Sequence, residues 1–451
     1  MNRVSVISAV ILAAMFTLCG CSPSYPESYD NGGEGGAVRP NDRNLDSVLI
    51  QLSLSDPLYS VETRGVGSFG PWTRDSVHWK DADMRVYAFS TYNGIEGGAD
   101  YSRDSLCLLD DQEAHIVDEF GQLWLYSPDG SHAWRYYRKT QPNTRYKFFM
   151  YHADDAVVGS PLYSGNTLSR HILLDGSQDL IHAFAYPTET QSAEAAAMLK
   201  MKETDAACYL YSYRAALSGL NPILHVQHLL CQMDVCVIGQ PVNTDEGKYK
   251  YLYQMMAVDN IGFTAAQGGT LLIANDAWER DTYLSDLDAG NVFRPDDTQR
   301  EHKCLLRSNP MSSNVWTRLY NKDVDFDAVR RQMTEAGWIG ESSVYYHLNG
   351  RSGVQDTLTA RPLLLPPQKE YILTIGGCWA DIDKDGICRI QRLPVNPIRI
   401  ASMDGKGFRR GHHYTLILTM YGPQKIGLGG LLDEWVEDGE LHVNTLNLQP
   451  L

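Results

Sequence analysis

The sequence predicts an all-β protein of two consecutive β-sandwich domains, with short helices confined to loops. Many short runs alternate apolar and polar residues, which is the period-two pattern of half-buried strands. Turn residues separate these runs at short intervals, as they do in sandwich proteins. The chain of 451 residues is too long for a single hydrophobic core, so we expect two domains, over residues 45–245 and 246–451.

Residues 1–21 are predicted to be a lipoprotein signal peptide. Arg3 precedes an apolar run that is too short and too abruptly ended to span a membrane. The run ends in Leu-Cys-Gly-Cys at residues 18–21, the bacterial lipoprotein pattern in which the last Cys is acylated and becomes the new N-terminus. We therefore expect Cys21 to carry the lipid, such as palmitate, and Cys19 to be removed with the signal. The alternative is an N-terminal core helix that ends in two chance cysteines.

Residues 22–44 are predicted to be a flexible tether between this lipid and the first folded strand. They are rich in Pro, Gly and acidic residues and contain almost no aliphatic side chains, so they cannot bury enough apolar surface to fold.

The first strand is predicted at residues 46–54, where every second side chain is apolar. These side chains are Val48, Ile50, Leu52 and Leu54. A Gly-rich loop follows and contains Arg64 and Gly65. An exposed Arg before a Gly is a common substrate of trypsin-like proteases, so the loop is open to cleavage whatever its role.

Further strands of the first domain are predicted from the same alternation, and they are residues 83–89, 116–126, 134–137, 146–151 and 208–213. Residues 192–202 are predicted to form a short helix with Ser192 as its cap, because the stretch is rich in Ala, Glu, Met and Lys. Strands of the second domain are predicted at residues 251–258, 270–274, 371–375 and 414–420. The polar region 275–314 between them shows few strand signals.

Residues 222–239 are predicted to be a pair of strand segments, because the apolar parity changes after Leu230. His228 lies on the apolar face of the first segment. Two interpretations of it stay open: a core histidine whose ring N–H donates to a neighbouring carbonyl, or a metal-binding or catalytic histidine. A core role is the more common one.

The composition argues against several classes of function. The net charge of −16 disfavours nucleic acid and anionic lipid surfaces as partners. The sequence has no His-Glu-x-x-His, no Gly-x-Ser-x-Gly and no phosphate-binding Gly loop with Lys. We therefore predict that the protein is not an enzyme and has no cofactor, no metal and no catalytic residues.

One motif resembles the first half of a calcium-binding EF-hand loop, at residues 381–386. The twelfth position is Arg392 instead of Glu, and both flanks read as strand, so a β-turn is favoured over a calcium site. A loop centred on Asp383 would bring Cys378 opposite Cys388, whereas a tight turn at residues 385–386 would put the two thiols out of register.

Two motifs resemble those of the fimbrillin-like family, lipoprotein subunits of bacterial type V pili. The first is the alternating strand, His-Leu-Leu and second alternating strand of residues 222–239. The second is the apolar run ending in Pro-Gln at residues 363–368. With the lipoprotein signal and the two-part β pattern, the resemblance covers most of the chain after the tether.

The resemblance implies two transthyretin-like Greek-key sandwiches and a structural or adhesive role in a surface pilus. A protease would cut after Arg64, between Arg64 and Gly65, and release the strand at residues 46–54. An incoming pilin subunit would then fill the apolar groove with a strand of its own. The implied location is the outer membrane, through the lipid on Cys21, and the fimbrium after maturation. Other pilin subunits are the implied partners, and the surface ligand is not identified.

A second class of function is a monomeric surface lipoprotein that binds glycans through exposed, coplanar aromatic rings. The candidates are Trp72, Trp79, Trp124 and Trp134. Core packing is the more common fate of such rings. A secreted hydrolase is a third reading, and it would require ionisable groups that converge in a cleft.

Overall fold

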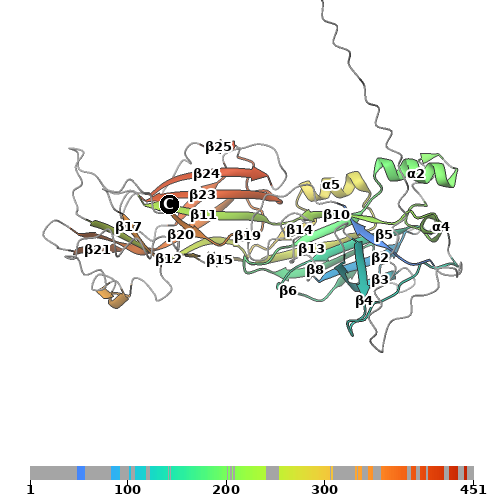
Figure 1. Cartoon of the computed structure of the whole chain (residues 1–451), viewed down its shortest axis with the longest axis horizontal. Coiled ribbons are helices and arrows are strands. Elements are labelled where there is room, and N and C mark those ends of the chain that lie inside the picture. Colours follow the sequence, from blue (N-terminus) through green and yellow to red (C-terminus); the bar gives the residue numbers. More distant parts are fainter. Residues whose placement is uncertain are drawn as a thin grey trace, which may run out of the picture. The chain divides into compact units, whose positions relative to one another are not determined.

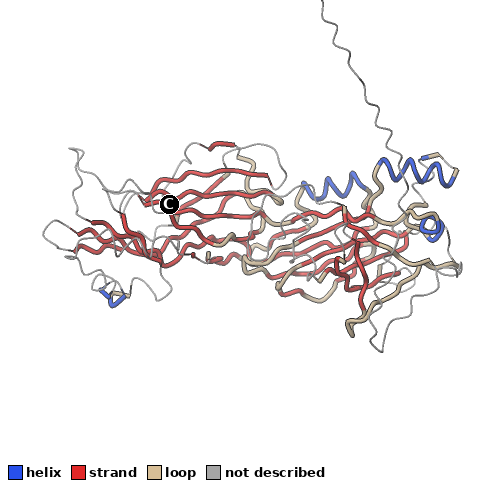
Figure 2. The backbone as a smooth tube through the Cα atoms, viewed as in Figure 1, coloured by secondary structure: helices blue, strands red, loops and turns tan. Residues whose placement is uncertain are grey.

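The computed structural model describes most of the chain between residues 48 and 443. The described residues are 48–55, 83–91, 101–102, 107–117, 122–140, 142, 144–200, 202–203, 206, 209–239, 253–304, 306–307, 331–332, 334–337, 344–348, 357–382, 388–392, 397–402, 405–420, 426–434 and 441–443. The predicted all-β class is confirmed, because strands form several sheets and only short helices connect them (Figures 1 and 2). No helix in this part of the chain is long and apolar enough to cross a membrane.

One sheet closes on itself, and we call it the barrel. Its strands, in order, are β1 (Leu52–Leu54), β10 (Ile223–His228), β9 (Ile181–Ala185), β5 (Tyr146–His152), β2 (Met84–Ser90), β3 (Cys107–Ile116) and β4 (Gln122–Tyr126). Neighbouring strands are antiparallel except β1 and β10, which are parallel. The interior is a buried apolar cluster to which Leu52, Val86, Phe148 and Leu224 contribute.

A second sheet, the cover sheet, shares another buried cluster with the barrel. Its strands are β14 (Phe293–Pro295), β13 (Gly268–Asn275), β8 (Thr167–Leu173), β6 (Val157–Val158) and β7 (Leu162–Ser164). Leu271 of β13 and Tyr283 of helix α5 (Arg280–Asp288) lie in this cluster with Phe149 of β5 and Phe184 of β9. β5 and β9 are therefore buried on both faces, and all of their residues are buried.

Two further sheets enclose a third apolar cluster, and we call them the second sandwich. The first contains β16 (Leu306–Arg307), β18 (Thr357–Ala360), β11 (Cys231–Gly239), β23 (His412–Met420), β24 (Ile426–Glu434), β25 (Leu441–Val443) and β19 (Leu363–Leu365). The second contains β15 (Gln299–Lys303), β12 (Tyr253–Ala266), β20 (Glu370–Ile382), β21 (Cys388–Arg392), β17 (Val344–Leu348) and β22 (Ile398–Ala401). Val235 of β11 and Phe263 of β12 both belong to the enclosed cluster.

The chain leaves the barrel and enters the second sandwich at Leu229 and Leu230. β10 before these residues is a barrel strand, and β11 after them pairs with β18, β19 and β23. The predicted parity change after Leu230 therefore coincides with a change of sheet. The domain boundary near residue 245 stays a prediction. β13 and β14 follow that boundary in sequence, but they lie in the cover sheet with β8, which precedes it.

The helix predicted over residues 192–202 is present as α2 (Glu189–Leu199). Its cap is Thr188 instead of Ser192: the Thr188 hydroxyl accepts from the Gln191 amide, and the Gln191 side chain accepts from the Thr188 amide. This reciprocal pair satisfies two amides that a helix start leaves unpaired.

The strand predicted at residues 208–213 is wrong. Residues 209–212 form a turn, and helix α4 (Tyr213–Leu217) follows. Tyr211 has a φ of 61°, which is incompatible with an extended strand, and the Ser212 hydroxyl caps α4 by accepting from the Ala215 amide.

Candidate functional site

The barrel is closed by its first strand, β1. Leu52 of β1 lies opposite Leu123 of β4, and Leu54 lies opposite Leu224 of β10. β1 therefore has a partner on each side, although it is the first described element of the chain and only three residues long. Its neighbours come from distant parts of the sequence, so β1 joins two edges that would otherwise lie open.

Backbone hydrogen bonds tie the first-strand segment, residues 48–55, to β10. The amide of Ser53 donates to the carbonyl of Pro222 at 3.2 Å. The amide of Ser55 donates to the carbonyl of Leu224 at 2.8 Å. The spacing of two residues on both chains is that of a regular parallel ladder.

Further backbone hydrogen bonds tie the same segment to the stretch that follows β4. The amide of Ile50 donates to the carbonyl of Arg135 at 2.8 Å, and the amide of Tyr137 donates to the carbonyl of Val48 at 3.0 Å. The segment is thus held along its length by main-chain bonds, which do not depend on the identity of its side chains.

Every second side chain of the segment enters the barrel interior. Ile50, Leu52 and Leu54 are 5%, 1% and 6% exposed, and Val48 packs against the same cluster. This confirms the predicted apolar face of the first strand. Complete burial of such side chains contributes about 1.5–3 kcal/mol each, so the segment is a substantial part of the barrel core.

Removal of the first-strand segment would leave a groove of defined chemistry. β10 and the chain after β4 would lose their backbone partners, and Leu123 and Leu224 would lose the side chains that cover them. An open edge beside an apolar groove is the arrangement that accepts an added strand. An incoming strand would need apolar side chains at alternate positions to fill it.

The predicted maturation and lipidation residues, Arg64, Gly65 and Cys21, lie outside the residues that the structure describes. In sequence, Arg64 falls between β1 and β2. Their roles stay predictions.

His228 lies at the end of β10 and contacts a buried carboxylate. Its Nδ1 is 2.9 Å from Oδ2 of Asp179, whose side chain is fully buried. Oδ1 of the same carboxylate accepts from the amide of Leu180. The contact supports the structural reading of His228. Among the described residues, the one group of three or more side chains that could hold a metal consists of Asp83, Glu113 and His115.

Trp124 and Trp134 lie close together, with the ring of His132 between them. His132 is 4.4 Å from Trp124 at an interplanar angle of 61°, and 5.8 Å from Trp134 at 28°. Both tryptophans are half-buried, and the rings pack on one another instead of forming one flat platform. Trp72 and Trp79 lie outside the described residues. The rings of Trp124, His132 and Trp134 therefore do not have the coplanar arrangement that the glycan-binding alternative requires.

The loop that resembles an EF-hand joins two antiparallel strands. Ile382 of β20 lies opposite Cys388 of β21, and Cys378 lies opposite Arg392. Cys378 is buried, and this pairing is the predicted register in which the two thiols do not lie opposite each other. Residues 383–387 of the loop lie outside the described residues.

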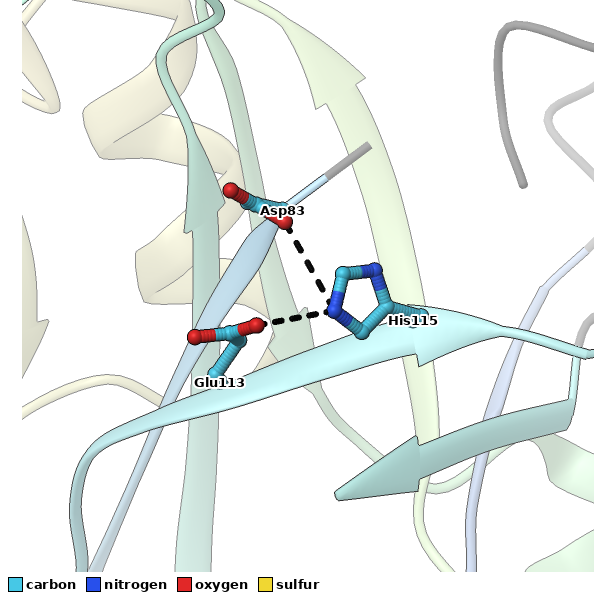
Figure 3. Close-up of side chains that lie close together, drawn as sticks. All are labelled: Asp83, Glu113 and His115. Atoms are coloured by element: carbon cyan, nitrogen blue, oxygen red, sulfur yellow. Dashed lines mark hydrogen bonds and ion pairs between the residues drawn. The ribbon is translucent and has the colours of Figure 1, made fainter. Parts of the chain in front are cut away.

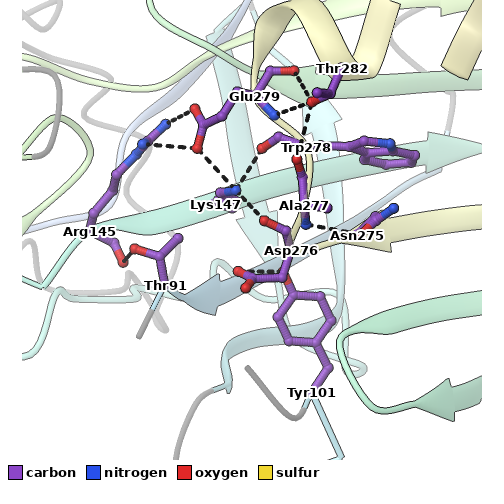
Figure 4. A network of polar contacts seen from close by, with 10 residues as sticks. All are labelled: Thr91, Tyr101, Arg145, Lys147, Asn275, Asp276, Ala277, Trp278, Glu279 and Thr282. Atoms are coloured by element: carbon purple, nitrogen blue, oxygen red, sulfur yellow. Dashed lines mark hydrogen bonds and ion pairs between the residues drawn. The ribbon is translucent and has the colours of Figure 1, made fainter. Parts of the chain in front are cut away.

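A buried lysine, which the sequence analysis did not single out, joins the barrel to the start of α5 (Figure 4). The Lys147 ammonium donates to the carbonyls of Asp276 and Trp278 at 2.5 and 2.6 Å and lies 3.2 Å from Glu279. Arg145 pairs with the same Glu279 carboxylate at 2.9 Å. Burial lowers the pKa of Lys147, and the carboxylates of Glu279 and Asp276 act against that shift.

His182 of β9 makes a second polar link from the barrel to the cover sheet. Its Nε2 lies 2.8 Å from the carbonyl of Ile273, and its Nδ1 lies 2.8 Å from the Tyr283 hydroxyl. A carbonyl only accepts, so Nε2 carries the proton and Nδ1 accepts from the tyrosine. Complete burial lowers the pKa of His182 to about 4, so the ring is neutral at pH 7.

No protein-family model and no curated protein matches the chain. Among solved structures, the chain is similar to a fimbrial protein from Bacteroides vulgatus, with 12% sequence identity and a TM-score of 0.47, over 86% of this chain and 99% of that one. It is also similar to the fimbrial anchor protein Mfa2 from Porphyromonas gingivalis, with 10% identity and a TM-score of 0.30, over 88% of this chain and 100% of that one.

Proposed function

We propose that the chain is a structural or adhesive subunit of a bacterial surface pilus, exported as a lipoprotein and assembled by β-strand exchange after proteolysis. The observation that carries this proposal is the position of β1. It is the first described strand, it closes the barrel between β4 and β10, and its apolar face is part of the core.

A single cut after Arg64 separates all that precedes it in sequence from all that follows. Of the described elements, β1 alone precedes Arg64, so the cut would separate it covalently from all the others. A cut between Arg64 and Gly65 would leave residues 48–55 attached to the barrel by non-covalent contacts alone. Those contacts are the backbone bonds and alternate apolar side chains that a strand from another subunit could replace.

The remaining parts of the proposal follow the sequence. Lipid on Cys21 would anchor the chain in the outer membrane, and residues 22–44 would give the folded part reach. The partners are other pilin subunits, and the net charge of −16 argues against nucleic acid. The role that we propose is structural, and it rests on the strand β1, which closes the barrel between β4 and β10.

Limited digestion of the full chain in detergent with a trypsin-like protease tests the proposal. We expect a new N-terminus at Gly65, followed by SDS-resistant ladders on gels. Arg64→Gln is the matched control, and it should give neither. A chain that is cut after Arg64 but stays a stable monomer would contradict strand exchange.

A further inference from the structure

Three potential metal ligands converge on the β2–β3 pair of the barrel (Figure 3). Glu113 and His115 are two residues apart on β3, so their side chains share one face of the strand. Met84 lies opposite Ala114, and this register brings Asp83, the residue before β2, beside His115. The backbone pairing therefore fixes all three positions.

The ligand atoms of the three side chains are close enough to share one ion. Nε2 of His115 lies 2.9 Å from Oε1 of Glu113 and 3.6 Å from Oδ1 of Asp83. All three atoms lie within 4.8 Å of one another. A tetrahedral ion with bonds of about 2.0–2.2 Å holds its ligand atoms about 3.4 Å apart, so shifts of about half an ångström or less would bring His115 to this distance from both carboxylates.

Neighbouring groups hold two of the ligands in place. Nδ1 of His152 donates to the backbone carbonyl of Asp83 at 2.8 Å, while Nε2 of His152 accepts from the amide of Asp154. The ring of His115 packs edge-on against Tyr126, with centroids 4.7 Å apart. Such outer contacts orient metal ligands and limit their reorganisation.

The local charge favours a cation. Arg85 lies 3.6 Å from Oε2 of Glu113, the oxygen that does not face His115. With a neutral His115, the group has two negative carboxylates, Asp83 and Glu113, and one positive guanidinium, Arg85, so its net charge is negative. The Asp83 side chain is 61% exposed, so solvent reaches the group and could supply the remaining ligands.

We propose that Asp83, Glu113 and His115 form a binding site for a divalent transition-metal ion, with Zn²⁺ as the ion to test. One imidazole and two carboxylates suit Zn²⁺, whereas Ca²⁺ and Mg²⁺ prefer oxygen ligands alone. The ion would tie the start of β2 to β3. The sequence analysis predicted no metal, because Asp83 is distant in sequence from the other two ligands.

Equilibrium dialysis of the full chain in detergent, without a polyhistidine tag, tests the site with Zn²⁺ as the probe. The chain also contains cysteine thiols, a residue type that binds Zn²⁺, so each variant is compared with the unaltered chain. We expect His115→Ala, Glu113→Gln and Asp83→Asn each to lose one bound Zn²⁺, or to weaken its binding at least tenfold. His171→Ala is the control. His171 lies on β8 in the cover sheet, and its Nε2 is 2.7 Å from Oδ2 of Asp296.

The control should keep the Zn²⁺ content of the unaltered chain. Circular dichroism of each variant shows whether the fold is kept, and the two amide variants retain side-chain shape. The site is refuted if His115→Ala binds Zn²⁺ as the unaltered chain does, or if His171→Ala loses as much.

Discussion

Leu52 of β1 and Leu123 of β4 lie directly opposite each other in the antiparallel register, and both side chains are buried in the barrel interior. The pair marks the seam at which the barrel closes. On its other side, β1 pairs in parallel with β10, where Leu54 lies opposite Leu224. The barrel thus depends on a segment that a single cut could separate from the rest of the chain.

Truncation of Leu52 should weaken the barrel strongly. Leu52→Ala removes a side chain that is 1% exposed, and such changes cost about 2–5 kcal/mol of unfolding free energy. Urea unfolding measures the effect. Ser53→Ala is the matched control, because Ser53 faces away from the core and its ladder bond is made by the backbone amide; we expect a change within about 0.5 kcal/mol. Equal effects of the two variants would contradict a core role for β1.

Loss of the His228 ring should destabilise the protein more than loss of an exposed histidine. His228→Ala would leave the fully buried Asp179 carboxylate without its imidazole partner, and loss of a buried group's hydrogen-bond partner costs about 1–3 kcal/mol, or more for a charged group. His171→Ala breaks an exposed pair with Asp296 and should cost no more than about 1 kcal/mol. Chemical denaturation of both variants provides the comparison. A His228→Ala variant as stable as His171→Ala would show that Asp179 does not need this partner.

His182 should make stability depend on pH in mildly acidic solution. Its pKa is lowered to about 4 in the folded protein, whereas an unfolded histidine titrates near about 6.5. The unfolded chain therefore binds a proton that the folded chain excludes between these values, so stability falls as the pH drops from about 6.5 to about 4. His182→Gln should flatten this slope in thermal melts. An unchanged slope would mean that other groups dominate it.

The Lys147 network should control the docking of the segment that leads into α5. Lys147→Met removes the donor of two carbonyls, those of Asp276 and Trp278, and each unpaired buried group costs about 1–3 kcal/mol. Hydrogen exchange should become faster at the amides of residues 278–288. Lys303→Met, at an exposed lysine 4.0 Å from Glu301, should leave these rates unchanged. Unaltered exchange in Lys147→Met would exclude this role.

The sequence reveals strands best where only one face is covered. β1 has an apolar face in the barrel and half-exposed residues between, so its alternation is clear. β5 was also predicted as a strand, but it is buried on both faces, by the barrel core and the cover sheet, so its sequence does not distinguish a core face from a solvent face. Lys147 lies within this strand, and a lysine between buried apolar side chains could have predicted the buried polar network.

Long-range pairing explains most of what the sequence analysis missed. β13 pairs with β8, which lies about a hundred residues earlier, and no local pattern encodes that register. The metal-ligand trio depends likewise on the β2–β3 register. In contrast, the Thr-x-x-Gln pattern of residues 188–191 is local, and it could have predicted Thr188 as the helix cap.

Exchange of the first strand itself is the most direct test of the proposed assembly. The full chain is cut after Arg64 and mixed with a fluorescent peptide of residues 46–55, and binding is followed by fluorescence anisotropy. We predict that the peptide binds the cut chain, does not bind the uncut chain and blocks ladder formation, while the same peptide with Leu52→Asp does neither. A peptide that binds cut and uncut chains equally, or ladders that form unimpeded in its presence, would contradict strand exchange at this groove.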